Sequence, residues 1–145
     1  MEYEKIEKLL DKSCFVIDFL PKQVQRDSHG QFFKIENYML NNYEQFGLSN
    51  RFIRVILKLM CYYHVTIRWG GEIDRPAPEK ITEIVNEIMY NHSGTLNVLF
   101  PENNALLVFE WDCMNLSIYN PDDEMQTLMR DIAMSEGLFW REAAN

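Results

Sequence analysis

The sequence lacks a long hydrophobic run, and no stretch approaches the roughly 18 consecutive apolar residues that a membrane-spanning helix requires. Cysteine is scarce, because Cys14, Cys61 and Cys113 are far apart and odd in number. The segment MEYEKIEKLLDK at the start is charged throughout and does not resemble a signal peptide. These absences predict a cytoplasmic protein with three reduced thiols and no contact with the membrane.

Basic residues are also few, with 14 Lys and Arg against 22 Asp and Glu, which gives a net charge of −8. This balance disfavours nucleic-acid binding, because phosphate contacts need a Lys and Arg surface. The shortage of basic residues lies in residues 76–145, which carry 3 basic and 12 acidic residues. Residues 1–75 carry 11 basic and 10 acidic residues. The asymmetry indicates either a surface for a basic partner or acidic helix faces that maintain solubility.

No motif for a metal or a nucleotide stands out in the chain. Cys61 and His64 have the spacing of half a zinc site, but zinc usually takes four ligands, and His29 and His92 have no Cys or His nearby. Cys61 is instead expected to be a small buried residue on an apolar helix. The sequence therefore predicts no metal and no cofactor.

Two arrangements could carry catalysis, and both have a simpler explanation. A nucleophilic cysteine paired with a histidine could be formed only by the fold. The candidates are Cys14 and Cys113 as thiols, and His29, His64 and His92 as bases. An acidic neighbour would raise the pKa of Cys113 rather than activate it. Glu110 and Asp112 share a strand face if the strand extends past Trp111, but a solvated strand end explains them equally well.

Residues Thr95–Tyr119 are predicted to form three short strands joined by two tight turns. Pro101 and the two following asparagines favour a turn between residues 96–100 and 105–111. Residues Ala105–Phe109 are apolar without alternation, which is typical of a strand covered on both faces. Leu116 and Ile118 alternate with polar residues, which indicates one buried face.

Three helices have the clearest patterns. Residues 78–91 place apolar side chains at helical spacing behind Pro78, and residues 121–136 follow Asn120 as a cap with an acidic first turn. A third helix is expected from Ser49, as its N-cap, to about Tyr63, and it is apolar over more than half its circumference. Its polar stripe consists of Arg51, Arg54 and Lys58.

The remaining elements are short. Helices are predicted at 2–12 and 37–46, and strands at 14–20, 31–36, 65–69 and 138–140, with a loop at 70–76. Strands 65–69 and 95–100 would pair in parallel through the helix between them. The expected fold is a single α+β domain over residues 1–145. It has a mostly antiparallel sheet of about five strands, with amphipathic helices packed on one face.

Several blocks of the sequence resemble a family of small bacterial proteins of uncharacterised function. The blocks are DFLP, QFFKIENYML, LFPENNALLVFE, LSIYNP and SEGLFW. The resemblance spans most of the chain and carries no catalytic signature. It implies a compact, single-domain, cytoplasmic bacterial protein and implies no activity.

The leading functional hypothesis is a small acidic module that binds a basic protein, as an inhibitor or immunity protein does. The candidate binding residues are Glu83, Glu87, Asp122, Asp123, Trp111 and Trp140. The alternative is an enzyme or a small-ligand-binding protein with a pocket built by residues distant in the sequence. Such a pocket would bring Glu110 and Asp112 together with a histidine or a cysteine. A homodimer through a sheet edge or through the final strand is compatible with either hypothesis.

Overall fold

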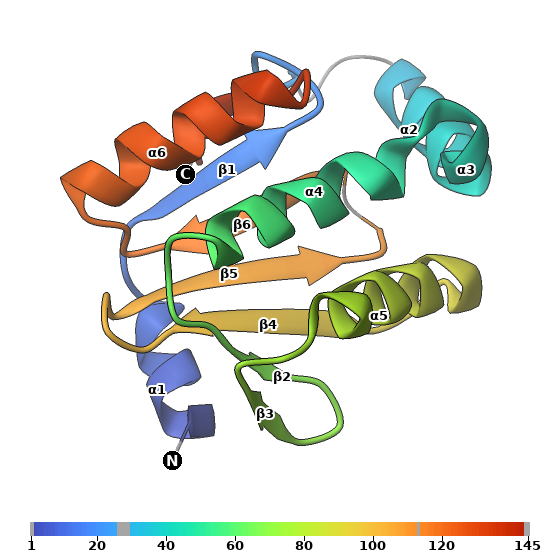
Figure 1. The fold of residues 1–145 in the computed structure, drawn as a ribbon. Helices are drawn as coiled ribbons and strands as arrows, with labels where there is room; N and C mark the ends of the chain where they lie inside the picture. The colour runs from blue at the N-terminus through green and yellow to red at the C-terminus, as the bar shows by residue number, and fades with distance from the viewer. Residues whose placement is uncertain (1, 26–29, 113, 144–145) are drawn as a thin grey trace.

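The computed structural model describes residues 2–25, 30–112 and 114–143, which fold around one antiparallel sheet of seven strands. The strands lie in the order β3-β2-β4-β5-β6-β1-β7, which the reader can follow in Figure 1 from β3 to β1. Their bounds are β1 Cys14–Asp18, β2 Thr66–Arg68, β3 Glu72–Asp74, β4 Thr95–Phe100, β5 Ala105–Glu110, β6 Asn115–Tyr119 and β7 Phe139–Glu142. The helices are α1 Glu2–Leu9, α2 Gln31–Asn41, α3 Tyr43–Phe46, α4 Leu48–Met60, α5 Pro78–Asn91 and α6 Asp123–Ser135.

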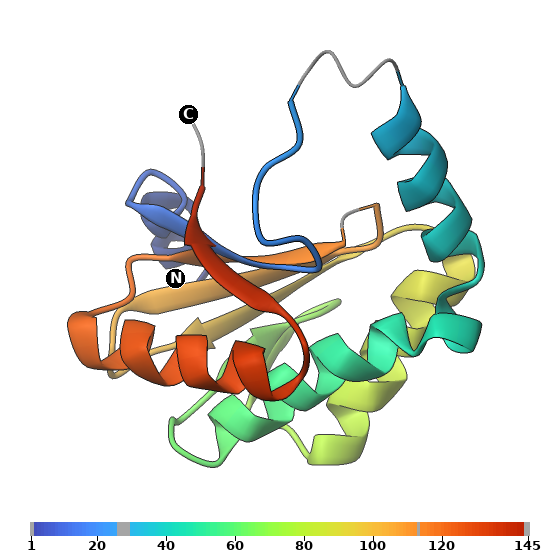
Figure 2. The ribbon, with the colours of Figure 1, turned by 90° about the horizontal axis from the view of Figure 1, so that it is seen from above.

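Helices α4, α5 and α6 cover one face of the sheet, as Figure 2 shows. Helix α4 lies between the other two and contacts both. The main core forms here, where the buried stripe of each helix meets the inward side chains of the strands, and Phe52 of α4 packs its ring against Phe109 of β5. An α+β fold with a mostly antiparallel sheet is therefore confirmed.

The opposite face of the sheet is only partly covered. Helix α1 packs there, and Ile6 and Leu9 form a second, smaller core with Leu99 and Leu106. The prediction of helices on one face is therefore wrong for α1. The central strand β5 is buried on both faces by this arrangement, which confirms the expectation drawn from its unbroken apolar run. Beyond α1, the same face of β1, β6 and β7 takes part in the site described below.

The predicted number of about five strands is too low, and one of the seven, β3, was not predicted because it has only one apolar residue, Ile73, between two acids. The segment expected to be a loop contains this strand, which folds back on β2 through Gly70 and Gly71. Both β3 and β4 pair antiparallel with β2, so the predicted parallel pairing of β2 with β4 is wrong. The extra reversal means that α5 connects β3 to β4, with β2 between them.

The segment 31–36 is also different from the prediction, since it begins helix α2 and is not a strand. Its apolar residues are spread around the helix, so that Phe32 is half-buried while Phe33 and Ile35 are exposed. This spread hides the helical period in the sequence, because a helix that faces a core shows one apolar stripe. Helix α2 therefore leaves about half or more of the surface of Phe33 and Ile35 in contact with solvent.

The start of one helix agrees with its prediction from the sequence, and the starts of two others differ from theirs. Helix α5 has the predicted bounds, with Pro78 in its first turn. Helix α6 is capped by Asp122, whose carboxylate accepts from the backbone N–H of Met125 at 2.8 Å, and not by Asn120. Helix α4 begins one residue before the predicted cap and follows Gly47, whose φ of 63° favours glycine. Among the described residues, no helix is long and apolar enough to cross a membrane.

The predicted polar stripe of α4 forms a contact between helices. Glu136, only 8% exposed at the end of α6, receives Arg54 Nε at 2.6 Å and Lys58 Nζ at 2.7 Å on its carboxylate. Arg51 donates to the carbonyl oxygen of the same residue at 3.0 Å. Burial alone would raise the pKa of Glu136, but the hydrogen bonds from Lys58 and Arg54 outweigh it and the pKa is lowered. These cations therefore join α4 to α6.

Replacing Glu136 with glutamine is expected to lower the free energy of unfolding at pH 7 by about 1–2 kcal/mol, because charged hydrogen bonds are lost while both cations remain partly solvated. A carboxyl whose pKa is lowered by folding contributes stability above its unfolded pKa, and this is lost as the pH falls through the folded value. The difference between wild type and E136Q should therefore shrink from pH 7 toward pH 3. Urea unfolding at several pH values measures this difference, with E87Q as the control, because Glu87 is exposed on α5. A difference independent of pH would contradict the ion pair.

Candidate functional site

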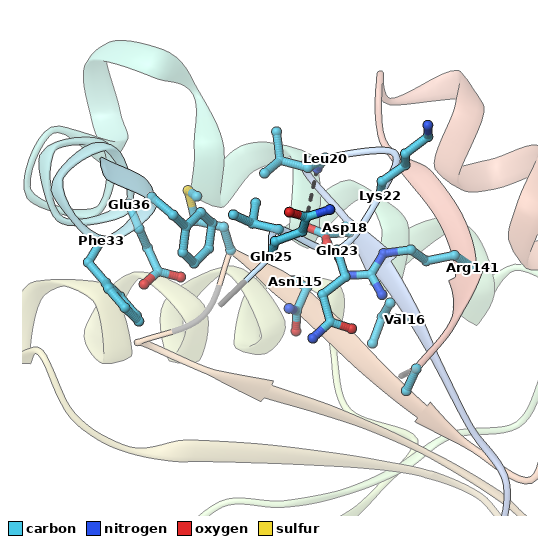
Figure 3. Close-up of a pocket in the computed structure, with 14 residues that line it drawn as sticks. Val16, Asp18, Leu20, Lys22, Gln23, Gln25, Phe33, Glu36, Asn115 and Arg141 are labelled. Atoms are coloured by element: carbon cyan, nitrogen blue, oxygen red, sulfur yellow. Dashed lines mark hydrogen bonds and ion pairs between the residues drawn. The ribbon is translucent and has the colours of Figure 1, made fainter. Parts of the chain in front are cut away.

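A groove with a volume of about 460 Å³ lies on the partly covered face of the sheet, between the ends of three strands and helix α2. We call it the α2 groove. Its floor comes from β1, β6 and β7, its rim from residues 20–25, and its far wall from α2 (Figure 3). The lining residues are Val16, Asp18, Leu20, Lys22, Gln23, Val24, Gln25, Phe32, Phe33, Glu36, Met114, Asn115, Arg141 and Ala143.

An ion pair between neighbouring strands forms the polar part of the floor. Arg141 of β7 reaches Asp18 of β1 with Nη2 at 2.5 Å from Oδ2, and Asp18 is only 7% exposed. The antiparallel register places Val16 opposite Arg141, so that Arg141 and Asp18 project from the same face. The other oxygen of Asp18 accepts from the N–H of Leu20 at 3.2 Å, which holds the start of the rim. The pair therefore fixes both the floor and the rim.

The wall contributed by α2 is largely aromatic and apolar. Phe32 and Phe33 lie with ring centroids 5.6 Å apart, and the groove continues past Phe32 into an apolar hollow of about 250 Å³. That hollow is also lined by Phe19, which precedes the rim, and by Ile35 of α2. The combination of a polar floor and an apolar wall is typical of sites that fix a ligand by a few polar contacts and bury its apolar part.

Glu36 gives this wall a negative charge. Its carboxyl group is half-buried, and burial is the largest cause that raises its pKa, followed by repulsion from the carboxylates of Asp112 and Asp18. Figure 3 shows Glu36 and Phe33 extending from α2 on the same side, while the ammonium group of Lys22 points away from the other lining side chains. A cation bound beside Glu36 would therefore offset this repulsion and stabilise the carboxylate.

The four acidic residues predicted from the sequence lie elsewhere. Glu83 and Glu87 are exposed on α5, and Asp122 and Asp123 are exposed at the start of α6. These helices cover the opposite face of the sheet from the α2 groove, and α4 with its cations runs between them (Figure 1). The fold therefore separates the two acidic pairs from each other and from the groove.

The two predicted tryptophans also lie outside the groove. Trp140 precedes Arg141 on β7, so it points to the helix-covered face, where its ring stacks on Phe15 with centroids 5.1 Å apart. Trp111 stacks on His92 with centroids 4.5 Å apart. Both side chains are half-buried and pack against the main core. They are placed to stabilise the fold.

The catalytic arrangements considered from the sequence do not come together in the described part of the chain. Strand β5 ends at Glu110, so the condition for Glu110 and Asp112 to share a strand face is not met. Burial raises the pKa of the Cys14 thiol, although hydrogen bonds from Tyr119 and Ile118 oppose this, so the thiolate is disfavoured. His29 and Cys113 lie outside the described residues. The residues known to line the α2 groove include no His, no Cys and neither of those two acids.

The side chains of Cys61 and His64 each have other contacts, and Cys61 Sγ lies 3.6 Å from the carbonyl oxygen of Leu57. Cys61 is exposed, contrary to the prediction, because α4 ends at Met60 and the next residue lies outside its buried stripe. His64 contacts two carboxylates instead, Asp74 at 2.6 Å and Glu102 at 3.3 Å. Hydrogen bonds from His64 and then Thr66 lower the pKa of Asp74. No cluster of three or more metal-ligating side chains occurs within residues 2–25, 30–112 and 114–143.

The groove residues Asp18, Glu36 and Arg141 were not among the candidates predicted from the sequence. One signal was present, since Asp18 interrupts the apolar run CFVIDFL and a charge in such a strand is usually paired when buried. Its partner lies 123 residues away, and only the strand order reveals it. Comparisons of the chain with protein families, curated proteins and solved structures gave no match. Function is therefore inferred from the geometry of the groove.

Proposed function

We propose that this chain is a small protein-binding module that holds a short segment of a partner protein in the α2 groove. The observation that carries the proposal is the open, amphipathic groove beside α2, whose Phe33 side chain is 65% exposed. Exposed aromatic side chains next to a hollow are typical of recognition surfaces, where they supply most of the binding energy. A net charge of −8 supports a basic partner, as in inhibitor and immunity proteins.

A second candidate is binding of a small molecule in the same groove. Its volume of about 460 Å³ is suitable for a ligand of moderate size. The buried pair of Asp18 and Arg141 could orient a polar group on such a ligand. An enzyme would additionally need a reacting group beside the ligand, and the geometry gives more support to binding than to catalysis.

Selection of a random library of short peptides against the immobilised protein tests the proposal. NMR spectra of the labelled protein with a selected peptide should show changes at Val16, Asn115 and Phe33 around the groove. Changes confined to Glu83, Glu87 and the start of α6 would move the binding surface to the acidic helices and overturn the proposal. If no peptide is selected and only small molecules bind, the second candidate replaces it.

Replacing Phe33 with serine is expected to weaken the selected peptide at least about tenfold, because an exposed aromatic anchor that becomes buried on binding contributes roughly 1.5–3 kcal/mol. The thermal midpoint should change little, since Phe33 is mostly exposed to solvent when no peptide is bound. Fluorescence anisotropy measures the affinity. Y90S is the matched control, because Tyr90 is 80% exposed on α5, away from the groove. Equal losses in both variants would contradict a role for the groove.

The oligomeric state stays a prediction of its own. Strands β3 and β7 form the two edges of the sheet, and β7 pairs with β1 on one side. Its other edge could pair with a second copy, as edge strands do in many dimers. Light scattering over a range of concentrations tests this, and a monomer throughout would remove the homodimer.

A further inference from the structure

We propose that Glu36 and the neighbouring Phe33 ring form the subsite for a lysine or arginine side chain of the bound segment. This inference rests on the proposed function and adds the chemistry that the groove selects. Both residues extend from α2 toward the same side, where a long side chain could lie along the ring and place its charge at the carboxylate (Figure 3). Lys and Arg combine an apolar stem with a charged end, as such a subsite requires.

The charges around the groove favour a cation over an anion. Asp18 and Arg141 are paired with each other, so neither is available to form an ion pair with a ligand. Glu36 has no hydrogen bond or ion pair to any other described residue, and the carboxylates of Asp18 and Asp112 are near enough to disfavour its own charge. A cationic side chain bound at Glu36 would relieve this repulsion, whereas an anion would increase it.

The apolar surroundings explain why a side chain fits better than a small ion. Phe33 is mostly exposed, and Phe32 leads from it to the apolar hollow. A hydrated ion would gain nothing from these rings, but the methylene stem of lysine or arginine would be removed from water against them. Adjacent residues of the segment could then fill the hollow. The subsite therefore favours a basic residue next to apolar residues.

Peptides selected for binding to the groove are accordingly expected to contain Lys or Arg beside apolar residues. Replacing Glu36 with glutamine should weaken such a peptide about tenfold, as expected for loss of a partly buried charged contact. The same peptide with its basic residue changed to glutamine should bind wild type and E36Q equally. E44Q is the matched control, because Glu44 is exposed on the adjacent helix α3 and does not line the groove.

Stability separates this role from a structural one. Because the folded protein disfavours the Glu36 carboxylate, the thermal midpoint of E36Q at neutral pH should equal or exceed that of wild type. A lower midpoint, or an equal loss of affinity for the basic and the neutral peptide, would overturn the inference. If peptides bind in the groove without any basic residue, the inference fails while the proposed function stands. If none binds in the groove, both fail.

Discussion

Replacing Ile84 with aspartate is expected to leave the chain unfolded under native conditions. Ile84 is only 1% exposed and lies on α5 in the main core. Loss of the side chain alone would cost about 2–5 kcal/mol, and a buried carboxyl without a partner adds several more. Their sum is comparable to the whole stability of an ordinary domain, about 5–15 kcal/mol. Circular dichroism of the purified variant should show no cooperative thermal transition.

Leu128 on α6 provides a matched control for this result. Its side chain is half-buried at the margin of the core, so an aspartate there could turn toward water. L128D should therefore lose about 1–3 kcal/mol and keep a cooperative transition at a lower temperature. Two variants with the same melting temperature would contradict the different burial of the Ile84 and Leu128 side chains. A near-native melt of I84D would contradict the assignment of α5 to the core.

Helix α5 could be predicted from the sequence for a physical reason. Its apolar residues all face one layer of the core, so their spacing follows the helical period, and Pro78 marks its first turn. The apolar residues of helix α2 do not all face one layer of the core. Phe32 and Phe33 both line the groove and Ile35 lines the adjoining hollow, yet Phe33 and Ile35 are exposed to solvent. The apolar side chains that border the groove therefore do not form one buried stripe, and the helical period is lost.

The order and direction of the strands could be predicted only where every helix and strand involved has a recognisable hydrophobic pattern in the sequence. Strand β3 is three residues long and lies at the sheet edge, where only Ile73 is partly covered. Missing it reversed the expected direction of β2 relative to β4. The α2 groove depends on the adjacency of β1 with β7, which are separated by most of the chain. Short-range spacing contains no information about such a pairing, so the site could not be found from the sequence.

Replacing Asp18 with leucine is expected to be the second most damaging change. It would leave the guanidinium of Arg141 largely buried without its partner, which typically costs about 3–5 kcal/mol. It would also remove the acceptor for the Leu20 N–H and so loosen the rim of the groove. Urea unfolding measures the loss. E142L is the control, since Glu142 is an exposed carboxylate on β7, the strand that carries Arg141.

The double variant D18L/R141L decides whether the charge left behind causes this loss. A pair of apolar side chains at these diagonal positions of β1 and β7 leaves no buried ion, so most of the stability should return, to within about 1 kcal/mol of wild type. If the two single losses simply add, the residues do not interact and the pair does not organise the floor. If the fold recovers while the selected peptide no longer binds, the ion pair serves recognition more than stability. Groove binding then depends on polar groups that the core could do without.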